Sequence, residues 1–408
     1  MTCENLDKWV EQLDFKGAKE RLNNKTNPTR LIYSDAFSNI FGNHIYLKPE
    51  NLQVTGAFKI RGAYNKISKM TEEQKTKGLI SASAGNHAQG VAYSAKEAGA
   101  SATIVMPSTT PLIKVEGTRK YGVNVLLYGT NFDEAFHKAE EIAKEKNLEF
   151  VHPFDDLDVI EGQGTISLEI LKEQPDIDII IVPIGGGGLI SGVAVAAKQI
   201  NPNIKIIGVE PEGAKSMTCS MEDGHIICLD NVDTIADGVA VKEPGKITYE
   251  LVRNYVDEII SVTDYEIMES FIEIMETHKL MAESSGAMSV AAAKKLKVWN
   301  KKVACVISGG NIDMVTISTM VQKGLVSKGR LFGFTVLLPD RPGELLNIAR
   351  ILAEMSANVV EVSHDQFKTA DRLTDVVLQV QVEANGHDHI NKIIERLYDE
   401  GYKVKRTS

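Results

Sequence analysis

The chain has 408 residues, of which 43% are hydrophobic and 25% charged, a composition typical of globular proteins. The net charge is −10 and no basic block occurs, so binding to a nucleic-acid polymer is disfavoured. No apolar signal core or membrane-length apolar run is present, and a cytoplasmic protein of two or three domains is expected. No CxxC spacing joins the four cysteines, and reduced thiols are expected at Cys3, Cys219, Cys228 and Cys305.

Short apolar runs alternate with stretches of helical spacing up to about residue 320. The predicted strands are Gly78–Ser83, Ala102–Met106, Asn124–Tyr128, Ile179–Ile184, Ile204–Glu210 and Val303–Ser308. Helices are predicted between them, for example over Asn131–Lys146 and Gly162–Glu173. This alternation indicates an α/β fold with parallel sheets covered on both faces. Ligands of such sheets bind where strands end and loops lead into helices.

The pattern changes near the C-terminus. Residues 321–330 predict a linker, because glycine, serine and lysine interrupt the apolar pattern there. The elements expected after it are a strand, a helix, two strands, a helix and a strand, over Phe332–Leu338, Pro342–Met355, Asn358–Asp365, Thr374–Val382, His387–Glu400 and Tyr402–Arg406. This βαββαβ order predicts a separate ferredoxin-like domain over residues 331–408.

Lys59 lies near the start of a helix predicted over Ala57–Met70. Its helical neighbours at i−3, i+3 and i+4 are all small, and they are Gly56, Gly62 and Ala63. These neighbours predict room beside the lysine for a flat ring. A lysine in an apolar pocket also loses its proton readily, as an imine-forming amine must. Read alone, a lysine at this position is far more typical of a solvated residue on a helix surface.

Three further loops follow predicted strands. Ser81–Gly90 leads into a helix, and its backbone N–H groups predict an anion site, although an ordinary Asn-capped helix start also fits. Gly185–Gly188 joins a strand to a helix and predicts either a phosphate cradle or a tight turn. It matches neither a dinucleotide fingerprint nor a Walker loop. The third loop, Ser308–Asn311, is polar and glycine-rich.

Together these segments resemble a known family. Glu50-Asn-Leu-Gln with Thr-Gly-Ala-Phe-Lys59, Ser83-Ala-Gly-Asn-His-Ala-Gln-Gly90, Gly185–Leu189 and Ser308-Gly-Gly-Asn311 occur in the order found in fold-type II enzymes that use pyridoxal 5'-phosphate (PLP). Among these the chain most resembles threonine dehydratase, also called threonine ammonia-lyase. The resemblance implies a catalytic domain over residues 1–320 with two parallel-sheet subdomains, the smaller over 48–155. The tail resembles an ACT domain, with Leu338-Pro-Asp-Arg-Pro-Gly343-Glu-Leu at its first strand–helix turn.

The resemblance implies roles for residues at matching positions. Lys59 would form the Schiff base with PLP and take the Cα proton of L-threonine, giving 2-oxobutanoate and ammonia. Asn86 would contact the ring hydroxyl and Ser308 the ring nitrogen, where a neutral hydroxyl favours elimination over transamination. The rest of the implied cofactor set is Phe58, Gly185, Gly186, Gly187, Gly188 and Leu189. The implied cradle for the substrate carboxylate is Ser83, Ala84, Gly85 and His87.

Two positions depart from patterns of related enzymes. Serine racemases carry an acid/base serine where this chain has Ala84, so efficient racemisation is not expected. The family's divalent-metal site would use Glu210, Ala214 and an acidic residue, but the third position is Ser216 and no metal ligand is assigned. L-Serine is expected as a second substrate, because losing one methyl group costs only about 1–3 kcal/mol of discrimination.

The ACT resemblance implies regulation by a small molecule bound between paired domains. A homo-oligomer, either dimer or tetramer, is therefore expected, with isoleucine, valine or AMP as the effector. The expected regulatory residues are Asp340, Arg341, Pro342, Gly343, Glu344 and Leu345, with Asn358 as a further candidate. A tail used only for oligomerisation stays open. The function also has alternatives that stay open. The chain could be an L-serine dehydratase or serine racemase-like enzyme, a β-replacement enzyme or threonine synthase, or a non-catalytic amino-acid sensor.

Overall fold

A computed structural model describes residues 3–365 and 375–407. Its contacts divide the chain into two units, Met1–Asp313 and Met314–Ser408. The second unit opens with helix α15 (Met314–Ser327), so most of residues 321–330 are helical, and the expectation of a linker there is corrected. Its one glycine, Gly324, costs a helix only about 1 kcal/mol relative to alanine, and Lys323 and Leu325 beside it are good helix formers.

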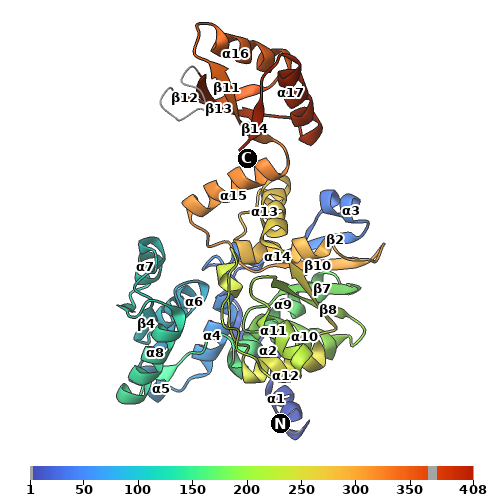
Figure 1. The fold of residues 1–408 in the computed structure, drawn as a ribbon. Coiled ribbons are helices and arrows are strands. Elements are labelled where there is room, and N and C mark those ends of the chain that lie inside the picture. Colours follow the sequence, from blue (N-terminus) through green and yellow to red (C-terminus); the bar gives the residue numbers. More distant parts are fainter. Residues whose placement is uncertain (1–2, 366–374, 408) are drawn as a thin grey trace. The chain divides into compact units, whose positions relative to one another are not determined.

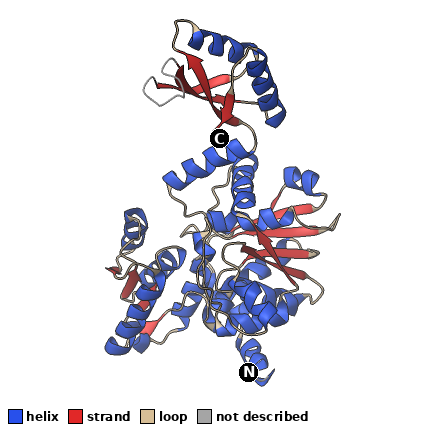
Figure 2. Ribbon diagram, in the orientation of Figure 1, coloured by secondary structure: helices blue, strands red, loops and turns tan. Residues whose placement is uncertain are grey.

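The larger sheet of the first unit has six strands in the order β1-β2-β10-β7-β8-β9. All neighbours are parallel except the edge pair β1 and β2. The strands are β1 (Ile32–Tyr33), β2 (His44–Pro49), β7 (Ile179–Pro183), β8 (Lys205–Pro211), β9 (Glu258–Val262) and β10 (Lys302–Ile307). The main covering helices are α9 (Leu157–Glu173), α10 (Gly188–Ile200), α12 (Lys246–Tyr255), α13 (Asp264–His278) and α14 (Ser284–Ala293). Figure 2 shows this sheet flanked by helices.

The smaller sheet has four parallel strands in the order β5-β4-β3-β6. They are β3 (Leu79–Ala82), β4 (Ala102–Met106), β5 (Asn124–Leu127) and β6 (Glu149–Phe150). Leu79 packs in the core beneath α4 (Lys59–Lys69) and α6 (Asn86–Glu97), and Ile80 in the core beneath α8 (Phe132–Lys146). In Figure 1 the teal elements β4, α6 and α8 form a layer distinct from the larger sheet. The predicted α/β fold with two parallel sheets is confirmed.

The remaining elements of the first unit are short. They are α1 (Cys3–Gln12), α2 (Phe15–Leu22), α3 (Asp35–Phe41), η1 (Glu50–Leu52), α5 (Glu72–Lys77), α7 (Leu112–Arg119), α11 (Ser216–Asp223) and η2 (Asp237–Val239). None of the helices described in either unit combines the length and the apolar character needed to cross a membrane.

The second unit contains a four-stranded antiparallel sheet in the order β12-β13-β11-β14. Its elements are β11 (Leu331–Pro339), α16 (Glu344–Glu354), β12 (Asn358–Asp365), β13 (Asp375–Glu383), α17 (His387–Asp399) and β14 (Val404–Arg406). Phe334 of β11 shares a core with Ile351 of α16 and Ile393 of α17. The predicted βαββαβ order is confirmed, while Thr374, the predicted start of the third strand, lies outside the described residues.

Candidate active site

Two segments far apart in sequence run antiparallel and bring Lys59 beside Ser308. The Phe58 N–H donates to the Ser308 carbonyl at 3.0 Å, and the Gly310 N–H donates to the Gly56 carbonyl at 2.9 Å. Ala57 and Gly309 form the bridge between these bonds. The start of α4 is thereby tied to the loop that follows β10.

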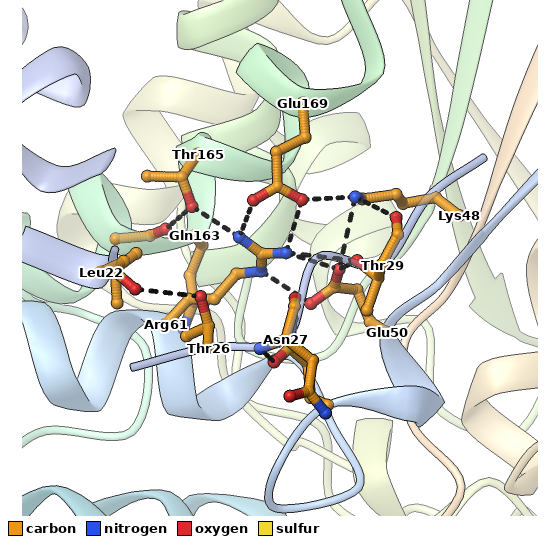
Figure 3. A network of polar contacts seen from close by, with 12 residues as sticks. Leu22, Thr26, Asn27, Thr29, Lys48, Glu50, Arg61, Gln163, Thr165 and Glu169 are labelled. Carbon is orange, nitrogen blue, oxygen red and sulfur yellow. Dashed lines mark hydrogen bonds and ion pairs between the residues drawn. The ribbon is translucent and has the colours of Figure 1, made fainter. Parts of the chain in front are cut away.

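A buried ionic network holds α4 from the other side (Figure 3). Arg61 is fully buried and donates to Glu50 at 2.7 and 2.8 Å and to Glu169 at 2.7 and 2.8 Å. Lys48 forms a further ion pair with Glu169. Burial disfavours the charged guanidinium, but the two carboxylates outweigh burial and raise the pKa of Arg61. Arg61 therefore fixes α4 at a position two residues after Lys59.

The small neighbours of Lys59 serve packing, so the predicted room for a ring at these positions is wrong. A Cβ on Gly62 would lie 2.7 Å from the Val159 carbonyl, where α4 crosses α9. A Cβ on Gly56 would lie 2.4 Å from Asn311 Oδ1, and Ala63 belongs to the core beneath the smaller sheet. Small residues at these positions let helices and loops approach closely.

The Lys59 side chain is half-buried and points at the loop between β6 and α9. Its Nζ donates to the Pro153 carbonyl at 2.7 Å and lies 5.3 Å from the centre of the Phe58 ring. Burial lowers the pKa of Lys59 to about 8, and the Glu283 carboxylate partly opposes that shift. The amine therefore becomes neutral more readily than a surface lysine.

Gly185–Gly188 connects β7 to α10, as the sequence predicts. Gly187 has φ of +93°, and a Cβ there would come within 2.8 Å of Met217 Cε and Thr248 Cβ. The Phe154 ring lies so close that a Cβ on Gly186 would sit 2.5 Å from it. In the described chain, Ser191 is the first residue after Ile184 whose N–H bonds a backbone carbonyl. The intervening N–H groups, at the start of a 13-residue helix, suit a phosphate.

Asn86 is held by two residues from the larger subdomain. Its Nδ2 donates to Glu283 Oε1 at 2.8 Å, and its Oδ1 accepts from Asn311 Nδ2 at 2.8 Å. The Ser285 hydroxyl also donates to Glu283 at 2.8 Å. Burial raises the pKa of Glu283 to about 7, against the lowering effect of Asn86. Sequence reasoning missed Glu283, whose one local signal is an acidic residue directly before the apolar helix α14.

The Ser83–His87 segment forms the start of α6. The Gly85 N–H donates to Ser83 Oγ at 3.2 Å, and no atom lies within 4 Å of where a Gly85 Cβ would stand. The His87 ring is buried against the Val151 carbonyl at 3.1 Å. Burial, with a smaller contribution from Lys59, lowers the pKa of His87 to about 3, so its ring is neutral. Because the space beside Gly85 is open, the N–H groups at the start of α6, next to Ala84, are accessible to a ligand. Such N–H groups suit a carboxylate.

The remaining positions expected to bind the cofactor or a metal lie in separate parts of the larger subdomain. Ser308 is 3% exposed at the end of β10, and Leu189 is 5% exposed in the first turn of α10. The Glu210 carboxylate accepts from the Met217 and Thr218 N–H groups at 2.9 and 2.8 Å and thereby caps α11. No group of three His, Cys, Asp or Glu side chains in the described residues is arranged to hold a metal ion.

Residues 22–309 match the family of pyridoxal-phosphate dependent enzymes, and the chain belongs to this family. It is 46% identical to the L-threonine ammonia-lyase of Thermotoga maritima over 393 residues, 96% of this chain and 98% of the relative. A solved structure of the processed form of threonine deaminase isoform 2 from Solanum lycopersicum shares 39% identity with a TM-score of 0.74, covering 79% of this chain and 94% of that one. Maize serine racemase shares 38% identity with a TM-score of 0.72, covering 77% and 97%.

The residues present fit PLP. A bare-backbone loop at a helix start suits its phosphate, a half-buried lysine of lowered pKa suits its aldehyde, and Asn86 and Ser308 offer neutral polar groups for its ring.

Proposed function

We propose that this chain is an L-threonine ammonia-lyase that converts L-threonine to 2-oxobutanoate and ammonia. The observation that carries the proposal is Lys59, a half-buried amine with a lowered pKa that points toward the loop packed on Gly185–Gly188. The L-threonine ammonia-lyase of Thermotoga maritima, which matches almost the whole chain, supports the choice of substrate.

Each proposed role follows from where the residue lies. Bound PLP supplies the electron sink for charge that develops at the substrate Cα. The neutral Lys59 amine takes the Cα proton as general base. The N–H groups at the start of α6 hold the substrate carboxylate, and those of Gly185–Leu189 hold the phosphate. The neutral Ser308 hydroxyl meets the ring nitrogen without adding charge, which favours loss of the β-hydroxyl over transamination.

The direct test is product analysis of the purified holoenzyme. L-Threonine alone should yield 2-oxobutanoate and ammonia in equal amounts, without a second substrate. The Lys59→Ala variant should lose roughly 10³-fold or more, because general-base catalysis alone contributes about 10²–10⁴-fold. Product that forms only when a thiol is supplied would instead indicate a β-replacement enzyme.

Two alternatives concern the same site. We propose L-serine as a secondary substrate, disfavoured by about 10–200-fold relative to L-threonine, the value of one methyl group. Racemisation is not proposed, because Ala84 cannot exchange a proton on the second face of the substrate. Formation of D-serine from L-serine at a rate comparable to pyruvate formation would instead indicate a serine racemase-like enzyme.

We further propose that the second unit is an ACT domain in a dimer or tetramer and binds isoleucine, valine or AMP. The proposed site is the turn from Asp340 to Leu345, which follows β11 and places Gly343 at φ of +100° before α16. Titrating each effector on the full chain and on Asp340→Ala tests it, and equal responses would exclude this turn. The free thiols of Cys219, Cys228 and Cys305 support a reducing compartment such as the cytoplasm.

A further inference from the structure

We propose that Asn311 is a positioning residue that fixes which way the Asn86 amide faces. This inference rests on the proposed contact between Asn86 and the PLP ring hydroxyl. Asn311 Nδ2 makes two hydrogen bonds, one to Asn86 Oδ1 at 2.8 Å and one to the Thr55 carbonyl at 2.7 Å. Both N–H groups of the Asn311 amide are thereby used, so this amide can only donate toward Asn86.

Glu283 completes the arrangement from the other end of the Asn86 amide. Asn86 Nδ2 donates one N–H to Glu283 Oε1 at 2.8 Å. A flipped Asn86 would turn its oxygen toward the Glu283 carboxylate and its N–H groups toward the Asn311 donor, losing both bonds. One orientation is therefore selected, and it leaves one N–H of Asn86 Nδ2 free to donate to the cofactor.

The chain fixes Asn311 itself through the ladder beside Lys59. The Gly310 N–H bonds the Gly56 carbonyl at 2.9 Å, and the Asn311 amide makes the next rung to Thr55. Gly56 has φ of +74°, and a Cβ there would meet Asn311 Oδ1 at 2.4 Å, so the glycine makes room for this amide. One turn, Ser308–Asn311, thus carries Ser308 and also orients Asn86.

The test uses Asn311→Asp, which keeps the shape but replaces the donor with an acceptor. Asn86 must then turn its amide or leave two oxygens facing each other. We expect the PLP affinity of the apoenzyme to fall about tenfold, as for one buried polar group left unpaired. The ratio of the visible to the near-ultraviolet absorbance of bound PLP should change as well. Asn311→Ala, which removes the donor without reversing it, should lose less.

Asn43→Asp is the matched control. Asn43 Nδ2 also donates to two backbone carbonyls, those of Phe41 at 3.2 Å and Val298 at 2.8 Å, and Asn43 is 3% exposed. It lies before the first residue of β2, whereas the Ser308–Asn311 turn follows the opposite end of the paired strand β10. Asn43→Asp should leave the PLP affinity and spectrum unchanged, and far-ultraviolet circular dichroism verifies that every variant is folded. A loss in Asn43→Asp equal to that in Asn311→Asp would overturn the proposal.

A double-mutant cycle with Asn86→Ala separates the possible failures. If Asn311 acts through Asn86, Asn311→Asp weakens PLP binding in the wild-type background and has little further effect in Asn86→Ala. Equal losses in both backgrounds would show a general structural role and contradict the proposal. If Asn86→Ala weakens binding but Asn311→Asp does not, this inference alone fails. If Asn86→Ala binds PLP normally, the proposed role of Asn86 fails and this inference with it.

Discussion

Lys59 and Pro153 are joined by a hydrogen bond of 2.7 Å from Nζ to the backbone carbonyl oxygen. The next residue, Phe154, packs its ring on Gly186 and its backbone on Gly188, so the bond ties the amine to the segment that covers the glycine loop. A carbonyl partner satisfies one N–H without adding a negative charge. Desolvation therefore still lowers the pKa of Lys59 to about 8, and the half-buried amine is chemically available.

The first prediction concerns the pH dependence of cofactor loading. Only the neutral Lys59 amine attacks an aldehyde, and its lowered pKa means that the neutral form dominates above about pH 8. The rate at which apoenzyme takes up PLP should rise about tenfold per pH unit well below 8 and level off above it. Time courses of visible absorbance measure this rate. A rate still rising steeply at pH 10 would contradict burial as the cause.

Glu283 gives that prediction an internal control. Its carboxylate opposes the lowering of the Lys59 pKa, so Glu283→Gln should move the inflection to lower pH. An inflection that moves upward or stays fixed would show that Glu283 does not act on Lys59 electrostatically.

The second prediction concerns the anchor of α4. Arg61→Met removes the guanidinium that bonds both Glu50 and Glu169 and leaves Lys48 to balance two carboxylates, so it should lower the free energy of unfolding by about 3–5 kcal/mol. Denaturant unfolding of the apoenzyme measures the loss. Arg119→Met is the control, since Arg119 pairs with Glu116 at 2.9 Å on the exposed surface and should cost about 1 kcal/mol or less. Similar losses in both variants would refute the anchoring role.

The third prediction compares two glycines of positive φ. Gly187→Ala adds a Cβ within 2.8 Å of Met217 and Thr248 and should weaken PLP binding at least about tenfold, since the loop must shift. Gly224, at φ of +80° with nothing within 4 Å of its Cβ position, lies at the end of α11. Gly224→Ala should cost about 1–2 kcal/mol of stability through backbone strain but leave PLP affinity unchanged. Equal PLP affinities in the two variants would argue against a phosphate at Gly187.

The fourth prediction addresses the choice of reaction. Ser308→Asp would place a carboxylate at the ring nitrogen and hold that nitrogen protonated, so the fraction of turnovers ending in transamination should rise. Ser308→Ala removes the hydroxyl without adding charge and should not raise that fraction. Mass spectrometry of the released cofactor measures the partition. An unchanged partition in Ser308→Asp would remove Ser308 from the account of specificity.

The strands and loops of this site were predictable because their signals are local. An apolar run followed by glycines and a helical pattern identifies the end of β7 from neighbouring residues alone, and β3 and β10 are similar. Strands β1, β2, β6 and β9 were not predicted. Strands β1 and β6 have only two residues each, and charged residues weaken the apolar pattern of β2 (Lys48) and β9 (Glu258). The ferredoxin-like order was predictable for the same reason, whereas glycine, serine and lysine within residues 321–330 were mistaken for the end of the helical pattern, which continues to Ser327.

The contacts that tune the site were not predictable, because they join distant residues. Glu283 reaches Asn86 across 197 positions, and Pro153 reaches Lys59 across 94. Nothing in either local sequence indicates its partner. The small residues around Lys59 were misinterpreted because a glycine that lets helices approach looks the same in sequence as one that leaves space for a ligand.

The central claim is that Lys59 is the residue that carries the cofactor. Borohydride reduction of the holoenzyme fixes bound PLP to its lysine, and peptide mass mapping locates the modified residue. We predict that the phosphopyridoxyl group lies on the peptide containing Lys59, and that Lys59→Ala gives no modified peptide. Modification of a different lysine, such as Lys48, with Lys59 unmodified, would contradict the account.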